Sequence, residues 1–240
     1  MLAQNLAIAE GTDRRATKGG QLLFAKSEAQ QIDAAKISVT VSGLRSWVNE
    51  VLDQPMVCGL ANETVSEALT LTGDLWSQLD QASNLLSRVN RPFRMKGPVS
   101  QSAYPYPPLA LKELLTNLLA HRDYQGGRWA MMTITREEIR FENPGGLVDS
   151  VRGQLEDESI QQVIGGGTRR LKGYRNPVVA DFFFSAGAMD KEGSGLPDVV
   201  QEAANNLNTV FFGPTTDNAS FQAVIRCRPE SLHVDQETKT

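Results

Sequence analysis

Residues 113–124 read ELLTNLLAHRDY. The leucines in this stretch and Ala120 have the spacing of a helix that packs on a core. Glu113, Asn117 and His121 are four residues apart, so they lie along one face of that helix. A solvated polar stripe on a surface helix is the simpler interpretation. A functional site is the alternative, and other segments of the chain discriminate between the two.

The composition indicates an ordinary soluble globular protein. The chain has 240 residues, of which 40% are hydrophobic and 22% are charged. That length allows one large domain or two small ones. No apolar run approaches the roughly 18 residues that a membrane helix needs, and the first residues lack the pattern of a signal peptide. The two cysteines, Cys58 and Cys227, make neither a disulfide framework nor a metal site, so we expect a cytoplasmic protein.

The net charge of −4 argues against nucleic-acid binding by the chain as a whole, because phosphate contacts need clustered positive charge. One local exception is TRRLKGYR at residues 168–175, which follows three glycines at 165–167. A solvated loop is the simpler interpretation of this basic cluster, and contact with phosphates is the alternative. Its cations are Arg169, Arg170, Lys172 and Arg175.

Two regions meet near the proline-rich YPYPP at residues 104–108. We expect an N-terminal region over 1–103, a second domain over 104–228 and a polar tail over 229–240. In the first region, GGQLLFAK (19–26) and AKISVTVSG (35–43) indicate short strands, the second by its period-two alternation. Apolar residues from Leu75 to Val89 predict a long amphipathic helix over 61–90, with Asn62 and Glu63 at its start.

The pattern after the prolines alternates between helices and hairpins. Pro107 and Pro108 predict the start of a helix over 109–121, because a missing amide proton costs little there. Pairs of strands are expected at 129–135 and 138–143, and again at 208–213 and 220–227. Between the pairs we expect a long segment over 147–192 containing a helix at 177–187, and then a helix from GSG to about residue 205.

Three groups of glycines follow the polar helix in the sequence: NPGG at 143–146, GGG at 165–167 and GSG at 193–195. GSG precedes a predicted helix, where backbone N–H groups attract anions. NPGG ends a strand, where glycine lets a planar ligand approach the backbone closely. Together with the helix, the glycines predict a nucleotide that lies between the polar face and two glycine turns.

The polar residues of the helix have the chemistry for such a ligand. The side-chain oxygen of Asn117 is a hard ligand suited to Mg²⁺ that bridges phosphates. Glu113, one turn earlier, is able to activate a water for attack on a terminal phosphate. The chain contains no G-x-x-x-x-G-K-[ST] sequence, so any nucleotide site is of a kind other than the P-loop.

These motifs resemble those of the GHKL superfamily, the Bergerat-fold ATPases that include gyrase, MutL and histidine kinases. Glu113-x-x-x-Asn117 is similar to the N box, NPGGL to the first glycine box and GSGL to the second. HRDY after the N box and RNP in the lid resemble more narrowly a subfamily labelled RecG C-terminal-like or Schlafen-AlbA-type transcriptional regulators. The resemblance covers about residues 15–227 and implies an α+β two-layer sandwich of mixed, largely antiparallel strands.

The resemblance implies roles for the helix residues. Asn117 would be the magnesium ligand and Glu113 the general base. His121, Arg122 and Asp123 would extend the helix face or cap its end beside the phosphates.

It also implies roles for the glycine boxes and the lid. In the superfamily an aspartate at the first glycine box recognises the adenine amino group, and Glu142 or Asn143 stands at about that place here. Gly145 and Gly146 would form the floor of the adenine pocket, and residues 147–192 would form the ATP lid. The residues expected to reach the phosphates are Arg169, Arg170, Lys172 and Arg175 from the lid, and Gly193, Ser194 and Gly195 from the helix start.

The resemblance therefore implies Mg-ATP binding, with ATP or ADP as the ligand. Relatives typically carry an upstream AlbA-like domain that contacts nucleic acid, and this chain lacks it, so we do not expect direct nucleic-acid binding. Many superfamily members also need a lysine from a following domain, which is missing here. We expect slow hydrolysis at most, in a conformational switch of a transcription- or defence-related protein, with a homodimer or a protein partner as options. A non-hydrolysing nucleotide sensor or degenerate interaction module is the alternative.

Overall fold

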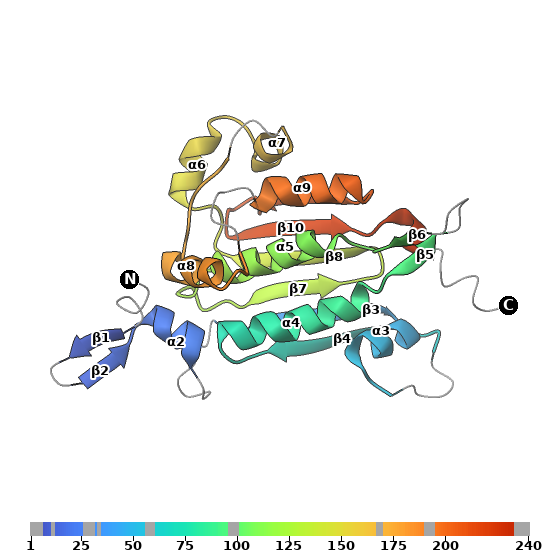
Figure 1. Ribbon diagram of the computed structural model, residues 1–240, viewed down its shortest axis with the longest axis horizontal. Helices are drawn as coiled ribbons and strands as arrows, with labels where there is room; N and C mark the ends of the chain where they lie inside the picture. The colour runs from blue at the N-terminus through green and yellow to red at the C-terminus, as the bar shows by residue number, and fades with distance from the viewer. Residues whose placement is uncertain are drawn as a thin grey trace.

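A six-stranded mixed sheet forms the centre of the computed structural model, which describes residues 7–10, 13–25, 32, 35–55, 61–95, 101–166, 170–189 and 195–232 (Figure 1). The strand order is β4-β3-β7-β8-β10-β9. β3 and β7 are parallel, and the other neighbours are antiparallel. The strands are β3 (Ile37–Leu44), β4 (Thr64–Leu71), β7 (Ala130–Ile134), β8 (Glu138–Pro144), β9 (Thr209–Pro214) and β10 (Ser220–Arg226).

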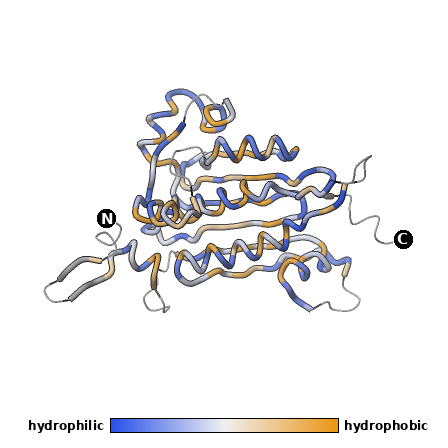
Figure 2. The backbone as a smooth tube through the Cα atoms, viewed as in Figure 1, coloured by the Kyte–Doolittle hydropathy of each residue, from blue (hydrophilic) through white to orange (hydrophobic). Residues whose placement is uncertain are grey.

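Three helices cover one face of this sheet: α4 (Leu75–Val89), α5 (Pro108–Ala120) and α9 (Gly195–Asn205) (Figure 1). Alternate residues of the strands face these helices, as in the buried set Ile37, Val39 and Val41 of β3. Hydrophobic and hydrophilic residues also alternate along α4 and α9 (Figure 2), because each helix buries only one side. The predicted α+β two-layer sandwich is confirmed.

The helix that carries the polar stripe lies in the middle of the helical layer. α5 begins with Pro108 at its first position after Pro107, as the sequence predicts. Its buried side packs between α4 and α9, with Leu114, Leu115 and Leu118 almost fully covered. The remaining face, with Glu113, Asn117 and His121, is only partly buried. This central position fixes the stripe relative to the end of β8.

Residues 18–24 form a helix, so the strand predicted over 19–26 is wrong. α2 (Lys18–Phe24) has Thr17 as its N-cap, whose hydroxyl accepts a hydrogen bond from the amide of Gly20 at 3.1 Å. A Cβ at Gly19 would lie 2.9 Å from the side chain of Val178 in α8 (Pro177–Ser185). The glycine therefore permits close helix packing here and does not break the helix.

The helix predicted over 61–90 is two elements. Residues 64–71 form β4, and only α4, from Leu75, is helical. Gly73, with φ of +105°, makes the break, and Asp74 caps the helix by accepting a hydrogen bond from the amide of Ser77 at 2.7 Å. Asn62 and Glu63 thus precede a strand and cap no helix. β3 and β4 belong to the same sheet as β7 to β10, and a domain boundary near residue 104 stays a prediction.

The segment 147–189 contains α6 (Asp149–Leu155), α7 (Ile160–Gly165) and α8, of which only the last is predicted from the sequence. Smaller elements complete the described chain: β1 (Ala7–Glu10), β2 (Asp13–Ala16), α3 (Arg45–Leu52), β5 (Phe93–Met95), β6 (Gln101–Ala103) and the 3₁₀ turn η2 (Pro229–Leu232). Across the described ranges, no helix combines the length and apolarity that crossing a bilayer requires.

Candidate functional site

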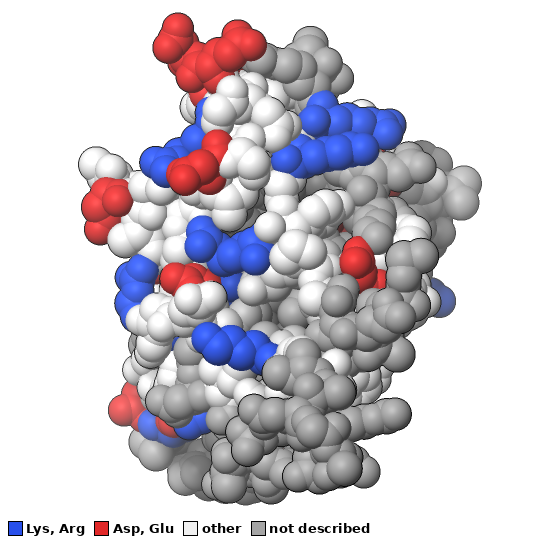
Figure 3. Space-filling view, turned by 90° about the vertical axis from the view of Figure 1, so that its left-hand side faces the viewer, with Lys and Arg blue, Asp and Glu red and all other residues white. Residues whose placement is uncertain are grey.

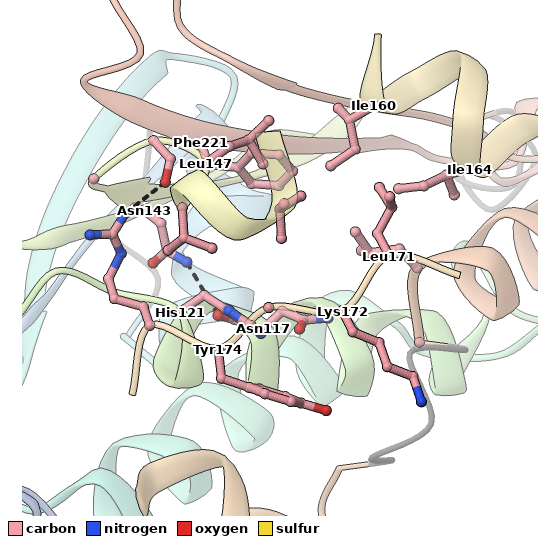
Figure 4. Close-up of a pocket in the computed structure, with 18 of the residues that line it drawn as sticks. Asn117, His121, Asn143, Leu147, Ile160, Ile164, Leu171, Lys172, Tyr174 and Phe221 are labelled. Atoms are coloured by element: carbon pink, nitrogen blue, oxygen red, sulfur yellow. Dashed lines mark hydrogen bonds between the residues drawn. The ribbon is translucent and has the colours of Figure 1, made fainter. Parts of the chain in front are cut away.

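A pocket lies between the polar face of α5, the turn after β8 and the segment 147–189 (Figure 4). Nine of its lining residues are ones that the sequence predicts for a nucleotide site. Two come from α5 and one is its C-cap, one comes from β8 and two from the turn after it, two from the segment before α8 and one from the start of α9. They are Glu113, Asn117, His121, Asn143, Gly145, Gly146, Lys172, Arg175 and Gly195.

Glu113 and Asn117 form a hydrogen-bonded pair on the wall of the pocket. The side-chain nitrogen of Asn117 donates to Oε1 of Glu113 at 2.8 Å, which is the contact expected one helical turn apart. Because the amide nitrogen is used in this way, the amide oxygen of Asn117 is the atom left to coordinate a cation. Gly195, the first residue of α9, lies so close that a Cβ there would overlap the Glu113 carboxylate. The carboxylate therefore lies against the backbone at the start of α9.

Asn143 lines the pocket and joins the end of β8 to α5. Its Nδ2 donates to the backbone oxygen of Asn117 at 3.2 Å (Figure 4). A backbone carbonyl only accepts, so this contact fixes which end of the amide is the nitrogen. Oδ1 of Asn143 is buried and has no hydrogen-bond partner among the described residues. Buried polar atoms are nearly always paired, so this oxygen is suited to a donor on a ligand.

The turn after β8 allows a close approach to the pocket. Gly145 has φ of +83°, and its amide donates to the backbone oxygen of Ala219 at 2.8 Å. A Cβ at Gly146 would overlap Asn218, whose side chain accepts a hydrogen bond from the amide of Leu147 at 3.0 Å. Gly146 is thus required by the packing of this turn against the β9–β10 hairpin, whereas Gly145 is required by its positive φ and by Arg175 and Asp123, which a Cβ there would meet at 2.9 Å.

His121 lines the pocket at the end of α5. Its ring stacks on Tyr174 with 5.9 Å between the centroids. Burial, with a smaller contribution from the positive charge of Arg175, lowers the pKa of His121 to about 4. The ring is therefore neutral at pH 7. Arg175 itself donates from Nη2 to the backbone oxygen of Gly146 at 2.7 Å, which joins the segment before α8 to the glycine turn.

Much of the remaining lining is apolar, and the sequence analysis did not identify it. These residues come chiefly from the segment 147–189: Leu147, Val148, Val151, Ile160, Ile164, Leu171 and Met189, with Leu196 and Phe221. Leu147, Ile160, Ile164 and Phe221 lie on the side of the pocket opposite Asn117 and His121 (Figure 4). An apolar slot with one buried acceptor suits a flat, mostly apolar ring that carries a donor. The sequence feature that could have indicated this lining is the set of apolar residues at 147–164.

Several predicted residues lie elsewhere. Glu142 faces the opposite side of the sheet, because alternate residues of a strand point to opposite faces, and it accepts a hydrogen bond from Gln222 at 3.1 Å. Of the two adenine-binding candidates, only Asn143 faces the pocket. Arg122 is fully buried and donates to the backbone oxygen of Lys36 at 3.0 Å, so it does not lie beside a phosphate site.

Two further predicted residues do not line the pocket. Asp123 follows α5, and its side chain accepts a hydrogen bond from the amide of Gln125. Arg170 is exposed. Arg169, Gly193 and Ser194 lie outside the described residues. On the side of the molecule that lies at the left in Figure 1, Lys and Arg side chains occur at several places between scattered carboxylates (Figure 3).

The comparisons with known proteins agree with this geometry. Residues 127–225 match the family model described as "Putative ATP-dependent DNA helicase recG C-terminal". This match supports an ATPase-like domain of that family in this part of the chain. The matched range of the ATPase-like domain includes the glycine turn, the segment 147–189 and the β9–β10 hairpin, and α5 precedes it.

A solved structure has the same fold as this chain. The crystal structure of the DIP2311 protein from Corynebacterium diphtheriae superposes with a TM-score of 0.61 at 17% sequence identity. The match covers 89% of this chain and 38% of that chain, so this chain spans well under half the length of that protein. No curated protein gives a significant match. At this identity the likeness concerns the fold, and the function rests on the site.

Proposed function

We propose that this chain binds ATP or ADP with Mg²⁺ in the pocket beside α5, as a GHKL-type domain. The observation that carries the proposal is the buried, unpartnered Oδ1 of Asn143. The exocyclic amino group of adenine is a donor on the edge of a flat ring, which is the ligand chemistry that this oxygen and the apolar slot suit. Asn143 would take the place of the aspartate of the superfamily and would make the same contact without a charge.

Asn117 and Glu113 would act at the phosphate end of the ligand. The amide oxygen of Asn117 would coordinate Mg²⁺, which when bound neutralises phosphate charge and orients the phosphates. Glu113 would accept the proton of an attacking water, and its hydrogen bond from Asn117 keeps the carboxylate directed along the pocket wall. Lys172, Arg175 and the backbone at the start of α9 are available for contact with phosphates.

Turnover would be slow, and binding would act mainly as a conformational switch in a regulatory protein related to transcription or defence. The apolar residues of the segment 147–189 would close on the adenine, so that binding and the position of this segment are coupled. A nucleotide sensor that does not hydrolyse is the second candidate. It is favoured by the hydrogen bond that already occupies one oxygen of Glu113.

Base discrimination tests the proposal. Isothermal titration would compare ATP with purine ribonucleoside triphosphate, which lacks the exocyclic amino group. We expect wild-type protein to bind ATP at least about tenfold more tightly, the discrimination worth about 1.4 kcal/mol. Asn143→Ala should remove most of this difference. Equal affinity of the wild-type protein for the two nucleotides would contradict the role of Asn143.

A further inference from the structure

Asn176 occupies an unusual position at the start of α8. It is the N-cap residue of that helix, and Pro177 follows it. An asparagine at this position normally accepts a hydrogen bond from the first turn of its own helix. No such bond is formed, and the side chain turns instead toward the end of α5. The side chain of Asn176 therefore bonds to the end of α5 and not to α8, the helix whose N-cap it is.

The Asn176 amide binds the two carbonyls on either side of His121. Nδ2 donates to the backbone oxygen of Ala120 at 2.9 Å and to that of Arg122 at 2.7 Å. The last carbonyls of a helix have no partner within the helix, and Ala120 is the last residue of α5. Both protons of one amide group are thus used to hold the backbone that precedes and follows a single pocket residue.

Other motif residues complete the cap of α5 in the same way. The backbone oxygen of Asn117 accepts from Asn143, and that of Leu119 accepts from the hydroxyl of Tyr124 at 2.6 Å. The Asn143 contact also fixes the acceptor in the pocket. The hydrogen bonds from Asn143 and Asn176 thus hold both the end of α5 and the adjoining wall of the pocket.

We propose that Asn176 is a positioning residue that holds His121 in the wall of the nucleotide pocket, an inference that rests on the proposed function. Its neighbour Arg175 binds the backbone oxygen of Gly146 at 2.7 Å, so two consecutive residues join the segment before α8 to both walls of the pocket. A shift of this segment would move His121 and the glycine turn together. The RNP sequence would in this way couple the segment 147–189 to the bound nucleotide.

The chain offers a matched control. Nδ2 of Asn208 donates to the backbone oxygens of Pro105 at 2.8 Å and Arg226 at 2.7 Å, the same two-carbonyl contact. Asn208 does not line the pocket. Asn176→Ala and Asn208→Ala each remove the donating amide without adding a charge beside His121. A change at the pocket that occurs only in the Asn176 variant is therefore due to the place of this contact beside His121. It is not a general effect of losing a two-carbonyl contact.

The experiment measures the pKa of His121 by NMR, in protein carrying His233→Gln so that one histidine remains. Isothermal titration of ATP is measured on the same variants. We expect Asn176→Ala to raise the pKa of His121 by at least about one unit toward its ordinary value of about 6.5, because the ring gains water and moves from Arg175. ATP affinity should fall by at least about tenfold. Asn208→Ala should change neither value.

An unchanged pKa of His121 in Asn176→Ala would overturn the proposal, and so would an equal change in Asn208→Ala. If Asn176→Ala does not fold, Asn176→Ser retains one neutral donor, which is too short to bond both carbonyls, and the same two results of the pKa measurement would overturn the proposal. Failure of the wild-type protein to bind ATP would contradict the proposed function. The pKa comparison would still decide whether Asn176 positions His121.

Discussion

At the scale of single residues, the Glu113 carboxylate lies against the start of α9 and accepts a hydrogen bond from Asn117. Glu113→Gln preserves the size of the side chain and its ability to accept that bond, but the amide cannot take a proton from water. We expect ATP hydrolysis to fall by at least about 100-fold while ATP affinity stays close to the wild-type value. Phosphate release and titration of ATP measure the two effects. Unchanged turnover in the variant would exclude Glu113 as the base.

Gly195 offers a second test at this scale. Gly195→Ala places a methyl group where the Glu113 carboxylate lies, so we expect weaker ATP binding and a lower thermal midpoint. Gly153→Ala, inside α6, is the control, because a Cβ there meets nothing within 4 Å. That variant should be more stable by about 0.5–1 kcal/mol, since alanine is the better helix former. Equal behaviour of the two variants in thermal unfolding would contradict the close contact.

Part of the residue-level site follows from the sequence, because α5 has a strong helical pattern. Four-residue spacing brings Glu113, Asn117 and His121 together, and all three line one pocket. The same kind of argument excludes Glu142, since Phe141 is buried and its neighbour must face the other way. The role of Asn176 was not predictable. Its partners are more than 50 residues away, and its position suggests an ordinary helix cap.

At the scale of elements, α4 begins at Leu75 because Asp74 caps it. Asp74→Ala removes the acceptor for the amide of Ser77, so we expect a loss of about 1 kcal/mol in the free energy of unfolding. Asn62→Ala should cost much less, because Asn62 is exposed and precedes a strand. Denaturant unfolding measures both variants. A larger loss from Asn62→Ala would favour the helix over 61–90 that the sequence predicts.

Two elements were mispredicted for physical reasons. The apolar residues of β4 alternate with exposed ones, a period-two signal that a search for helical spacing across Gly73 overlooks. The segment 19–26 was predicted as a strand, but it forms most of α2, where the close packing of Gly19 against α8 depends on a tertiary contact. Hydrophobic periodicity therefore predicts an element when one face of that element is buried. It fails where a contact with a distant element explains why a residue is present.

At the scale of the whole molecule, His121 links stability to pH. Its pKa of about 4 in the folded protein is below the ordinary value of about 6.5, so the unfolded chain binds more protons between these values. This contribution to stability is complete above about pH 6.5 and is lost as the pH falls through about 4. We expect His121→Gln to reduce the fall in thermal midpoint over this range, compared with wild type. Parallel curves for the two proteins would contradict a buried, neutral His121.

The sequence predicted a two-layer sandwich but not that β3 and β4 extend its sheet. Strong local patterns gave the β7–β8 and β9–β10 hairpins and the helices beside them. The parallel pairing of β3 with β7 joins residues almost one hundred positions apart, as in Ile37 with Ala130. No local pattern specifies such a register, so the extension of the sheet by β3 and β4 became known only from the structure.

Titration of ATP with and without Mg²⁺, on wild-type protein and Asn117→Ala, tests the central claim most directly. The proposed function assigns the cation to the amide oxygen of Asn117, so we expect Mg²⁺-dependent binding of ATP that the variant loses. Absence of ATP binding by the wild-type protein in the presence of Mg²⁺ would contradict the nucleotide site. Binding that is equal in the variant would contradict the role of Asn117.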